Sequence, residues 1–216
     1  MKNKQAVIKK IRAVFDQADF PGEGFLQGSF EGEEPYEEVA PFHNLKDWRK
    51  IDAEFLDAHA GALSFFSEAG FRFYLPAYLI ADLDGQLETA DPLFHLTHGF
   101  FDFSVEVPVG ERVFVRRSGK SSLINPRRYG AALTSDHARF RLSIFTREEA
   151  GAIVEYLNFK RDRDPHGIDG PRIDAALESF WLERSRSAPS AETLRRHLAN
   201  EQEFIEAVRS NQEKLN

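Results

Sequence analysis

The chain has 216 residues, of which 42% are hydrophobic and 29% are charged, a composition typical of a globular protein and not of a disordered or fibrous one. It carries 35 Asp and Glu against 28 Lys and Arg, and the resulting net charge of −7 has the wrong sign for binding nucleic acid through bulk charge. It contains no cysteine, which excludes disulfides, thiolate nucleophiles and cysteine-held metal clusters. We expect no cofactor.

The sequence shows neither a secretory signal nor a membrane span. The first twenty residues interleave charged and single apolar residues, and the longest apolar stretch, residues 73–81, includes a proline. A span needs roughly 18 apolar residues. We therefore expect a cytoplasmic protein. The unusually high count of 20 Phe predicts a large aromatic core or an apolar docking face.

The first third of the chain predicts two helices separated by a long loop. Residues 3–18 place apolar side chains at helical spacing, from Val7 to Phe15. Residues 19–44 are rich in glycine and proline and are expected to form a loop that aromatic rings hold to the core. A short helix follows at about residues 52–60, with Asp52 as its N-cap.

A central helix is expected at residues 68–84, with Ser67 as its N-cap and Gly85 after its end. Its apolar residues cover nearly all sides, which predicts a helix inside the protein. Pro76 lies well past the first turn, so we expect the helix to be kinked or split near Leu75.

The pattern then changes to alternation. Residues 101–107 alternate, and the apolar run 113–115 follows after a turn at Gly110, which predicts a β-hairpin. Residues 139–144 alternate too and are expected to add a third strand. Thr146 and Glu149 form a capping-box pattern that opens a helix to about Arg163.

A glycine- and proline-rich charged stretch at 161–172 is the best boundary candidate, and a C-terminal helical pair follows it. The first helix starts near Pro171. The second starts after Ser190 and carries a heptad seam with two polar interruptions, Glu201 and Gln212. This narrow apolar stripe is expected to pack on the helix at 171–186, the alternative being a homodimer through residues 190–216.

Motifs for catalysis are absent or incomplete. Gly119-Lys120-Ser121 lacks the first glycine of a phosphate loop, because that position is Phe114. Neither a Gly-x-Ser-x-Gly elbow nor a His-Glu-x-x-His sequence occurs. Ser135, Asp136 and His137 are adjacent in sequence, and adjacent residues seldom meet in the geometry of a catalytic triad.

His95 and His98 could bind a metal together with Asp91 or Asp102 if they lay in a helical turn. The flanking residues favour a strand, where the two rings would point to opposite faces. We therefore expect two partly exposed polar residues at a strand end, and we assign neither a metal ligand nor a catalytic residue.

The charges are segregated along the chain. Residues 16–59 hold twelve acidic and three basic residues, whereas residues 112–141 hold eight basic residues and one acidic residue. Both segments could be solvated surface, the basic segment could touch RNA or phosphate groups, or it could dock on an oppositely charged macromolecule. The candidate binding residues of this basic patch are Arg112, Arg116, Arg117, Lys120, Arg127 and Arg128.

The blocks ALSFF at 62–66 and FRFYLPAYL at 71–79 resemble the core signature of a family of uncharacterised bacterial proteins, a domain of unknown function. Trp48, the acidic stretch around Tyr36 and the helix at 146–159 are similar in order. The resemblance extends over residues 5–160, with 104–138 as an insertion, and implies a bacterial cytoplasmic domain without adding any catalytic residue.

The sequence thus predicts a mainly helical α+β protein: a core domain at 1–163, with a hairpin-bearing insertion at 104–138, and a C-terminal helical extension at 164–216. We expect a non-catalytic protein-binding or regulatory protein whose partner is a macromolecule other than nucleic acid. The alternatives are an enzyme of unrecognised type that acts on a small polar or phosphorylated substrate through His95, His98 or His137 with a carboxylate, and a homo-oligomeric structural module.

Overall fold

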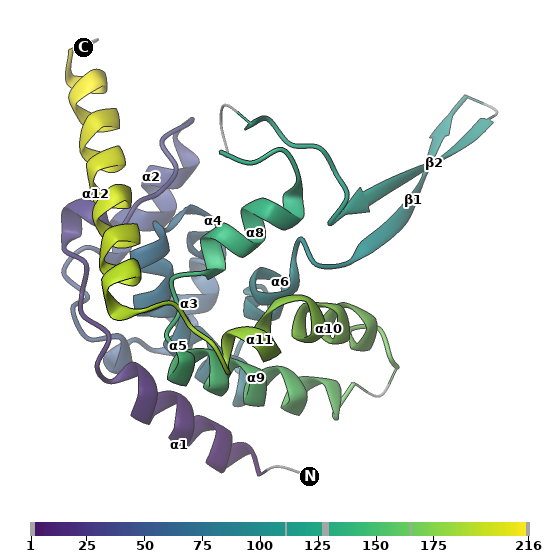
Figure 1. Cartoon of the computed structure of the whole chain (residues 1–216), viewed down its shortest axis with the longest axis horizontal. Helices are drawn as coiled ribbons and strands as arrows, with labels where there is room; N and C mark the ends of the chain where they lie inside the picture. Colours follow the sequence, from purple (N-terminus) through teal and green to yellow (C-terminus); the bar gives the residue numbers. More distant parts are fainter. Residues whose placement is uncertain (1–2, 111, 127–129, 165, 215–216) are drawn as a thin grey trace.

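The protein is a mainly helical α+β structure with one two-stranded antiparallel sheet, which confirms the expected fold class (Figure 1). The computed structural model describes residues 3–110, 112–126, 130–164 and 166–214. No helix in these ranges is both long enough and apolar enough to cross a membrane.

The centre of the fold is α5 (Glu68–Leu83), in which twelve of 16 residues are buried. The Ser67 side chain accepts a hydrogen bond from the Gly70 amide at 2.9 Å and caps the helix, as expected. Of the two outcomes expected near Leu75, a kink or a split, the split is wrong, because the helix runs through Pro76 without interruption. Packing on nearly every side holds the residues before and after Pro76 in helical geometry despite the missing amide donor.

The N-terminal part of the chain wraps around α5. The predicted first helix is α1 (Lys4–Phe15), which packs on α5 and on α9 (Arg147–Arg161). The expected loop at 19–44 is only partly a loop, since it contains α2 (Glu34–Val39) and 3₁₀ turns at Glu23–Phe25 and Ala40–Phe42. Pro35 sits in the first turn of α2, where its missing amide costs no hydrogen bond.

Three short elements follow before α5. A 3₁₀ turn at Trp48–Lys50 precedes α3 (Ala53–Ala58) and α4 (Ala62–Phe65). Asp52 caps α3 as predicted, and its carboxylate accepts the Phe55 amide at 2.8 Å. Buried aromatic rings, among them Phe42, Phe66 and Tyr74, pack edge to face and stacked between these elements and α5.

After α6 (Pro92–Thr97) the chain leaves the helical body as the predicted hairpin, β1 (Asp102–Val109) and β2 (Arg112–Gly119). Figure 1 shows this hairpin extending away from the helices as an arm. The expected third strand at 139–144 is wrong, because these residues lie in and after α8 (Thr134–Leu142). Its buried residues are Thr134, Ala138 and Leu142, which repeat every four residues as a helix requires.

The predicted capping box opens α9, with Thr146 and Glu149 exchanging hydrogen bonds between side chain and backbone. The chain then continues as α10 (Gly170–Ala176), a π-helical turn (Leu177–Trp181) and α11 (Leu182–Arg184). Trp181 is fully buried in the same hydrophobic cluster as α5 and donates its indole N–H to the Leu96 carbonyl at 2.8 Å.

The last helix, α12 (Ala191–Glu213), starts at the predicted cap Ser190 and lies against the N-terminal end of α5. Ile205 of the predicted seam is buried and Leu198 packs on the core. The polar interruption Glu201 has a structural role, because its carboxylate accepts hydrogen bonds from the backbone amides of Glu68 and Ala69 at the start of α5.

Candidate functional site

The arm formed by β1 and β2 carries the described part of the predicted basic patch. Residues directly opposite each other in an antiparallel pair share a face. The register pairs Val105 with Arg116, Val107 with Phe114 and Val109 with Arg112. One face of the arm, which we call the apolar–basic face, therefore consists of Phe103, Val105, Val107, Val109, Arg112, Phe114, Arg116 and Ser118.

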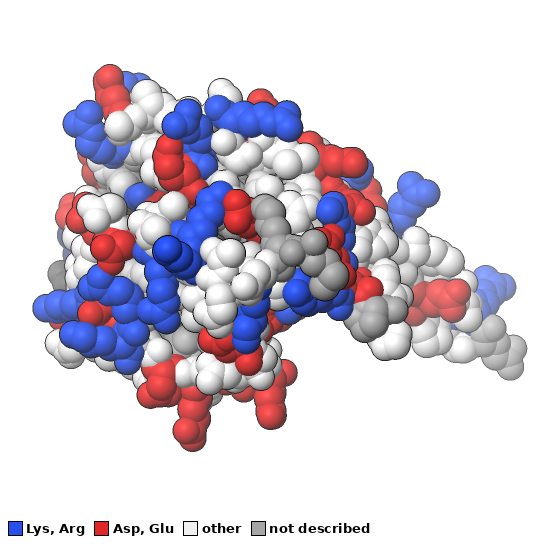
Figure 2. Space-filling view, turned by 90° about the horizontal axis from the view of Figure 1, so that it is seen from below, with Lys and Arg blue, Asp and Glu red and all other residues white. Residues whose placement is uncertain are grey.

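The apolar–basic face is open to solvent along its length. Val107 is 38% exposed, Phe114 is 53% exposed, and the two arginines of this face are exposed as well. Eight residues per strand, at about 3.3 Å each, give an arm on the order of 25 Å long. Figure 2 shows the arm standing out beyond the body of the molecule.

The charges on the two faces of the arm differ. The acidic residues Asp102 and Glu106 alternate with the apolar residues of β1 and so lie on the opposite face, together with Arg117. The eight residues of the apolar–basic face include no carboxylate, and its formal charge is that of two arginines. This face is therefore both apolar and cationic.

Polar contacts close the base of the arm, where its two strands join the rest of the chain. The Asp102 carboxylate accepts the amide of Ser121 at 2.9 Å and its hydroxyl at 2.6 Å. Gly119 has φ +117°, and a Cβ atom there would lie 2.0 Å from the Phe101 carbonyl oxygen. Only glycine fits at this closing position.

The described residues of the predicted basic patch do not all lie on one face of the arm. Arg112 and Arg116 lie on the apolar–basic face, Arg117 lies on the other face, and Lys120 follows at the base of the arm. Arg127 and Arg128 lie outside the described residues. On the face seen in Figure 2, basic and acidic side chains are intermixed over the body.

Three histidines meet at a cavity of about 310 Å³ between α4, α6 and α8. The expectation that His95 and His98 lie at a strand end is wrong, because His95 lies in α6 and His98 caps its C-terminus. Asp91 in fact caps α6 by accepting the Phe94 amide at 2.9 Å, and this cap with Pro92 starts the helix that the sequence analysis missed. The cavity is lined by Ser64, Phe94, His95, His98, Ile124, Thr134, His137, Ala138, Arg141 and Leu142.

The guanidinium of Arg141 brings a positive charge to this cavity. It donates a hydrogen bond to the Leu63 carbonyl at 2.6 Å and lies 4.9 Å over the Phe71 ring. Desolvation lowers the pKa of Arg141, and the carboxylates of Glu68 and Glu201 oppose that shift. The group stays charged, because an arginine is not deprotonated in proteins.

The imidazoles of His95 and His98, beside Arg141, are held in their neutral form. Desolvation, with repulsion from Arg141 and His98, lowers the pKa of His95 to about 3. Desolvation and Arg141 also lower the pKa of His98. No Asp or Glu is among the described lining residues, so the histidine–carboxylate pair that an acid–base site would need is not formed in this cavity.

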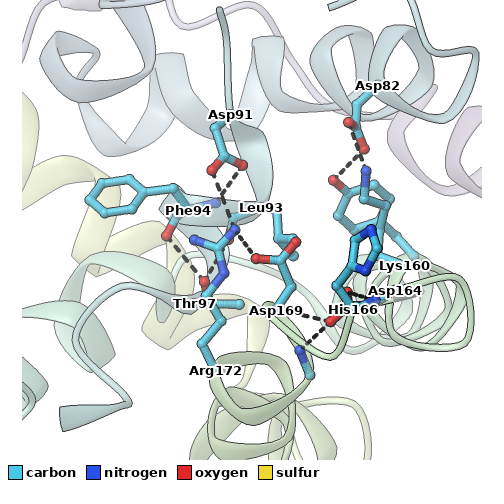
Figure 3. Close-up of polar contacts among 12 residues, drawn as sticks. Asp82, Asp91, Leu93, Phe94, Thr97, Lys160, Asp164, His166, Asp169 and Arg172 are labelled. Atoms are coloured by element: carbon cyan, nitrogen blue, oxygen red, sulfur yellow. Dashed lines mark hydrogen bonds and ion pairs between the residues drawn. The ribbon is translucent and has the colours of Figure 1, made fainter. Parts of the chain in front are cut away.

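A second polar cluster, shown in Figure 3, joins α5, α6, α9 and α10. Asp82 accepts the Tyr156 hydroxyl at 2.7 Å and the Lys160 ammonium at 2.9 Å. Arg172 lies 2.8 Å from Asp169 and 3.4 Å from Asp91. A cavity of about 260 Å³ borders the cluster. Because these carboxylates are paired within the chain, the cluster connects helices rather than presenting a reactive group.

None of these groupings forms a metal site: within the described ranges, no group of three or more His, Asp or Glu is placed to hold a metal ion.

The comparison with protein families finds a match for the N-terminal part of the chain. Residues 3–108 match a family of unknown function, DUF6714. The DUF6714 segment contains both blocks of the signature at 62–79 and Trp48, which confirms the predicted resemblance to a family of unknown function. It ends within β1, so the resemblance is supported only to residue 108 and not through 160. No curated protein and no solved structure matches the chain.

The DUF6714 segment supplies only part of each candidate site. It includes His95 and His98, whereas His137 and Arg141 of the same cavity lie beyond it. It includes most of β1, whereas β2 with its arginines lies beyond it.

Proposed function

We propose that this protein is a non-catalytic binding protein and that the apolar–basic face of its arm docks on an acidic surface of a different protein. The observation that carries the proposal is that the arm projects from the body with this face uncovered. An isolated two-stranded hairpin is at best marginally stable in water. Exposed apolar rows on such a ribbon are typical of surfaces that a partner covers.

The charge of the face selects the partner. Arg112 and Arg116 flank Val107 and Phe114 on a face without carboxylates. A partner with an apolar centre and an acidic rim would bury the apolar side chains and neutralise the arginines. The chain's own net charge of −7 disfavours nucleic acid, and two arginines on the face are few for phosphate-driven binding. The lack of cysteine fits a role in the cytoplasm.

Photo-crosslinking in cells tests this proposal. A photoreactive amino acid at position 107 would report on the apolar–basic face, and the same group at position 106, one residue away on the opposite face, is the matched control. We expect position 107, and not position 106, to crosslink to one protein through a peptide rich in Asp and Glu. The double substitution Arg112→Glu and Arg116→Glu should abolish this adduct.

Three results would overturn the proposal: no adduct at position 107, equal adducts at 106 and 107, or adducts at 107 only with nucleic acid or with a second copy of the chain. Circular dichroism provides the folding control for the double variant, because the helical body accounts for most of the signal and does not depend on these two exposed arginines.

A further inference from the structure

The histidine cavity is large enough for a small ligand and is built from separate parts of the chain. Its volume of about 310 Å³ is at the lower end of the range of small-molecule pockets, roughly 300–1,000 Å³. Ser64 comes from α4, His95 from α6, and His137 and Arg141 from α8. Phe94, Ile124 and Leu142 add an apolar wall. Such a mixture of apolar lining and a few converging polar groups is typical of ligand sites.

The polar groups of the cavity favour an anion. Arg141 forms no ion pair with a carboxylate among the described residues, and its one hydrogen bond there uses a single donor of a fork that has five. Each neutral imidazole can donate one N–H group. The chain as a whole is acidic, whereas the described lining of this cavity contains a guanidinium and no carboxylate. The local charge at the cavity is therefore opposite in sign to the net charge of the chain.

A phosphate group fits these donors better than a carboxylate does. A phosphate monoester presents three terminal oxygens, which can accept from several directions, whereas a carboxylate presents two in one plane. Arginine recognises phosphate through paired N–H groups. The phosphate oxygens would face Arg141 and the imidazoles, and the organic part would face the apolar wall.

We propose that this cavity binds the phosphate group of a small phosphorylated molecule, with the Arg141 guanidinium and the N–H groups of His95, His98 and His137 as its donors. This site is separate from the arm and does not depend on the proposed protein partner.

Bound phosphate would raise the pKa of the imidazoles of His95 and His98. Arg141 and desolvation disfavour their protonated form in the free cavity, and a bound dianion would offset the repulsion from Arg141. Glu68 and Glu201, which act on Arg141 from α5 and α12, are the nearby acidic groups.

Histidine NMR of the full chain tests the site, with inorganic phosphate and phenyl phosphate as probes and sodium chloride at matched ionic strength. We expect the imidazole resonances of His95, His98 and His137 to shift in a saturable way at about 10 mM phosphate, which saturates a site with a dissociation constant near 1 mM. The resonances of His43, which is exposed outside the cavity, should not shift. Phenyl phosphate should bind more tightly than inorganic phosphate.

Two variants separate binding from folding. Arg141→Gln should lower phosphate affinity at least about tenfold, since it removes a charged donor. Arg141 also contacts Leu63 and Phe71, so its replacement changes packing as well as charge. The second variant is therefore His98→Asn, which replaces an exposed residue at the mouth of the cavity and should lower phosphate affinity about threefold. His43→Asn is the matched control and should leave affinity unchanged. Uniform shifts of all histidines, equal shifts with acetate, or wild-type affinity in folded His98→Asn would overturn the proposal.

Discussion

The buried Glu149 carboxylate and the half-buried Arg72 guanidinium form an ion pair that connects α5 to α9 across 77 residues of sequence. The Arg72 guanidinium donates three hydrogen bonds of 2.9–3.0 Å to the Glu149 carboxylate. The same carboxylate accepts the Thr146 amide at 2.8 Å in the capping box. One side chain therefore both starts α9 and fixes that helix against the central one.

Glu149→Ala should lower the free energy of unfolding by about 3–5 kcal/mol, because it leaves a half-buried guanidinium without its partner and removes a helix cap. Urea denaturation measures this. The neighbouring Glu148 pairs with Arg147 on the surface, so Glu148→Ala should change stability by no more than about 0.5 kcal/mol. Equal losses in the two variants would contradict the structural role of the Arg72–Glu149 pair.

Ile205→Ala should destabilise the protein by about 2–4 kcal/mol, because it opens a cavity where α12 meets the body. Ile205 is 1% exposed, whereas its neighbour Phe204 is 58% exposed on the same helix. Phe204→Ala is therefore the control and should have almost no effect on thermal unfolding. A larger loss of stability in Phe204→Ala than in Ile205→Ala would contradict this packing and would indicate that another chain covers the exposed side of α12.

Glu201 should make stability depend on pH. Burial and the nearby Glu68 carboxylate raise the pKa of Glu201 from 4.5 to about 7. The folded state therefore holds this proton more tightly than the unfolded state. The contribution of this protonation to the free energy of unfolding is fully present below pH 4.5 and is lost as the pH rises through 7. It amounts to at most about 3 kcal/mol.

Measuring urea unfolding from pH 4.5 to 8 in wild type and Glu201→Gln tests this. The stability of the wild type relative to the variant should fall across this range. The exposed Glu203 lies on the same helix, and Glu203→Gln should follow the wild-type curve. The hydrogen bond that His197 donates to the Glu68 carboxylate raises the pKa of His197, so that pair adds a fall of the same sign, which both variants retain. Parallel curves for Glu201→Gln and wild type would contradict the account.

Gly119→Ala should unfold the arm locally, at a cost of about 1–3 kcal/mol for backbone strain in addition to the clash with Phe101. Hydrogen exchange of the β1 and β2 amides measures the loss of protection, while the amides of α5 should stay protected. Gly110 also has positive φ, but a Cβ there meets no atom within 4 Å, so Gly110→Asn is the matched control. Retained protection in Gly119→Ala would show that the base of the arm is not fixed as described.

Local chemistry made several elements predictable. Ser67, Asp52, Thr146 and Ser190 were recognised as caps because a side-chain oxygen before an apolar periodic segment has a specific hydrogen-bonding role. Alternation over residues 101–107, a turn at Gly110 and the apolar run 113–115 predict the hairpin. Both signals depend on neighbouring residues only, so no tertiary information was needed.

The errors arose where tertiary contacts decide the structure. Phe140, Leu142 and Ile144 alternate as a strand would, but Phe140 is exposed and the buried positions follow a four-residue repeat that starts at Thr134. Glu201 appeared to interrupt a heptad, because nothing in the sequence shows that it meets the amides of α5. The histidine cavity was missed for the same reason, although the cap Asp91 and Pro92 together signal the start of α6.

The central claim, that the apolar–basic face is a protein-binding surface, is tested most directly by the affinity of the purified chain for the protein that crosslinks at position 107. We predict that Val107→Asp weakens binding at least about tenfold, as expected for a central interface residue, and that Ser104→Asp on the opposite face changes it less than about twofold. Equal affinities of Val107→Asp and wild type would contradict the account.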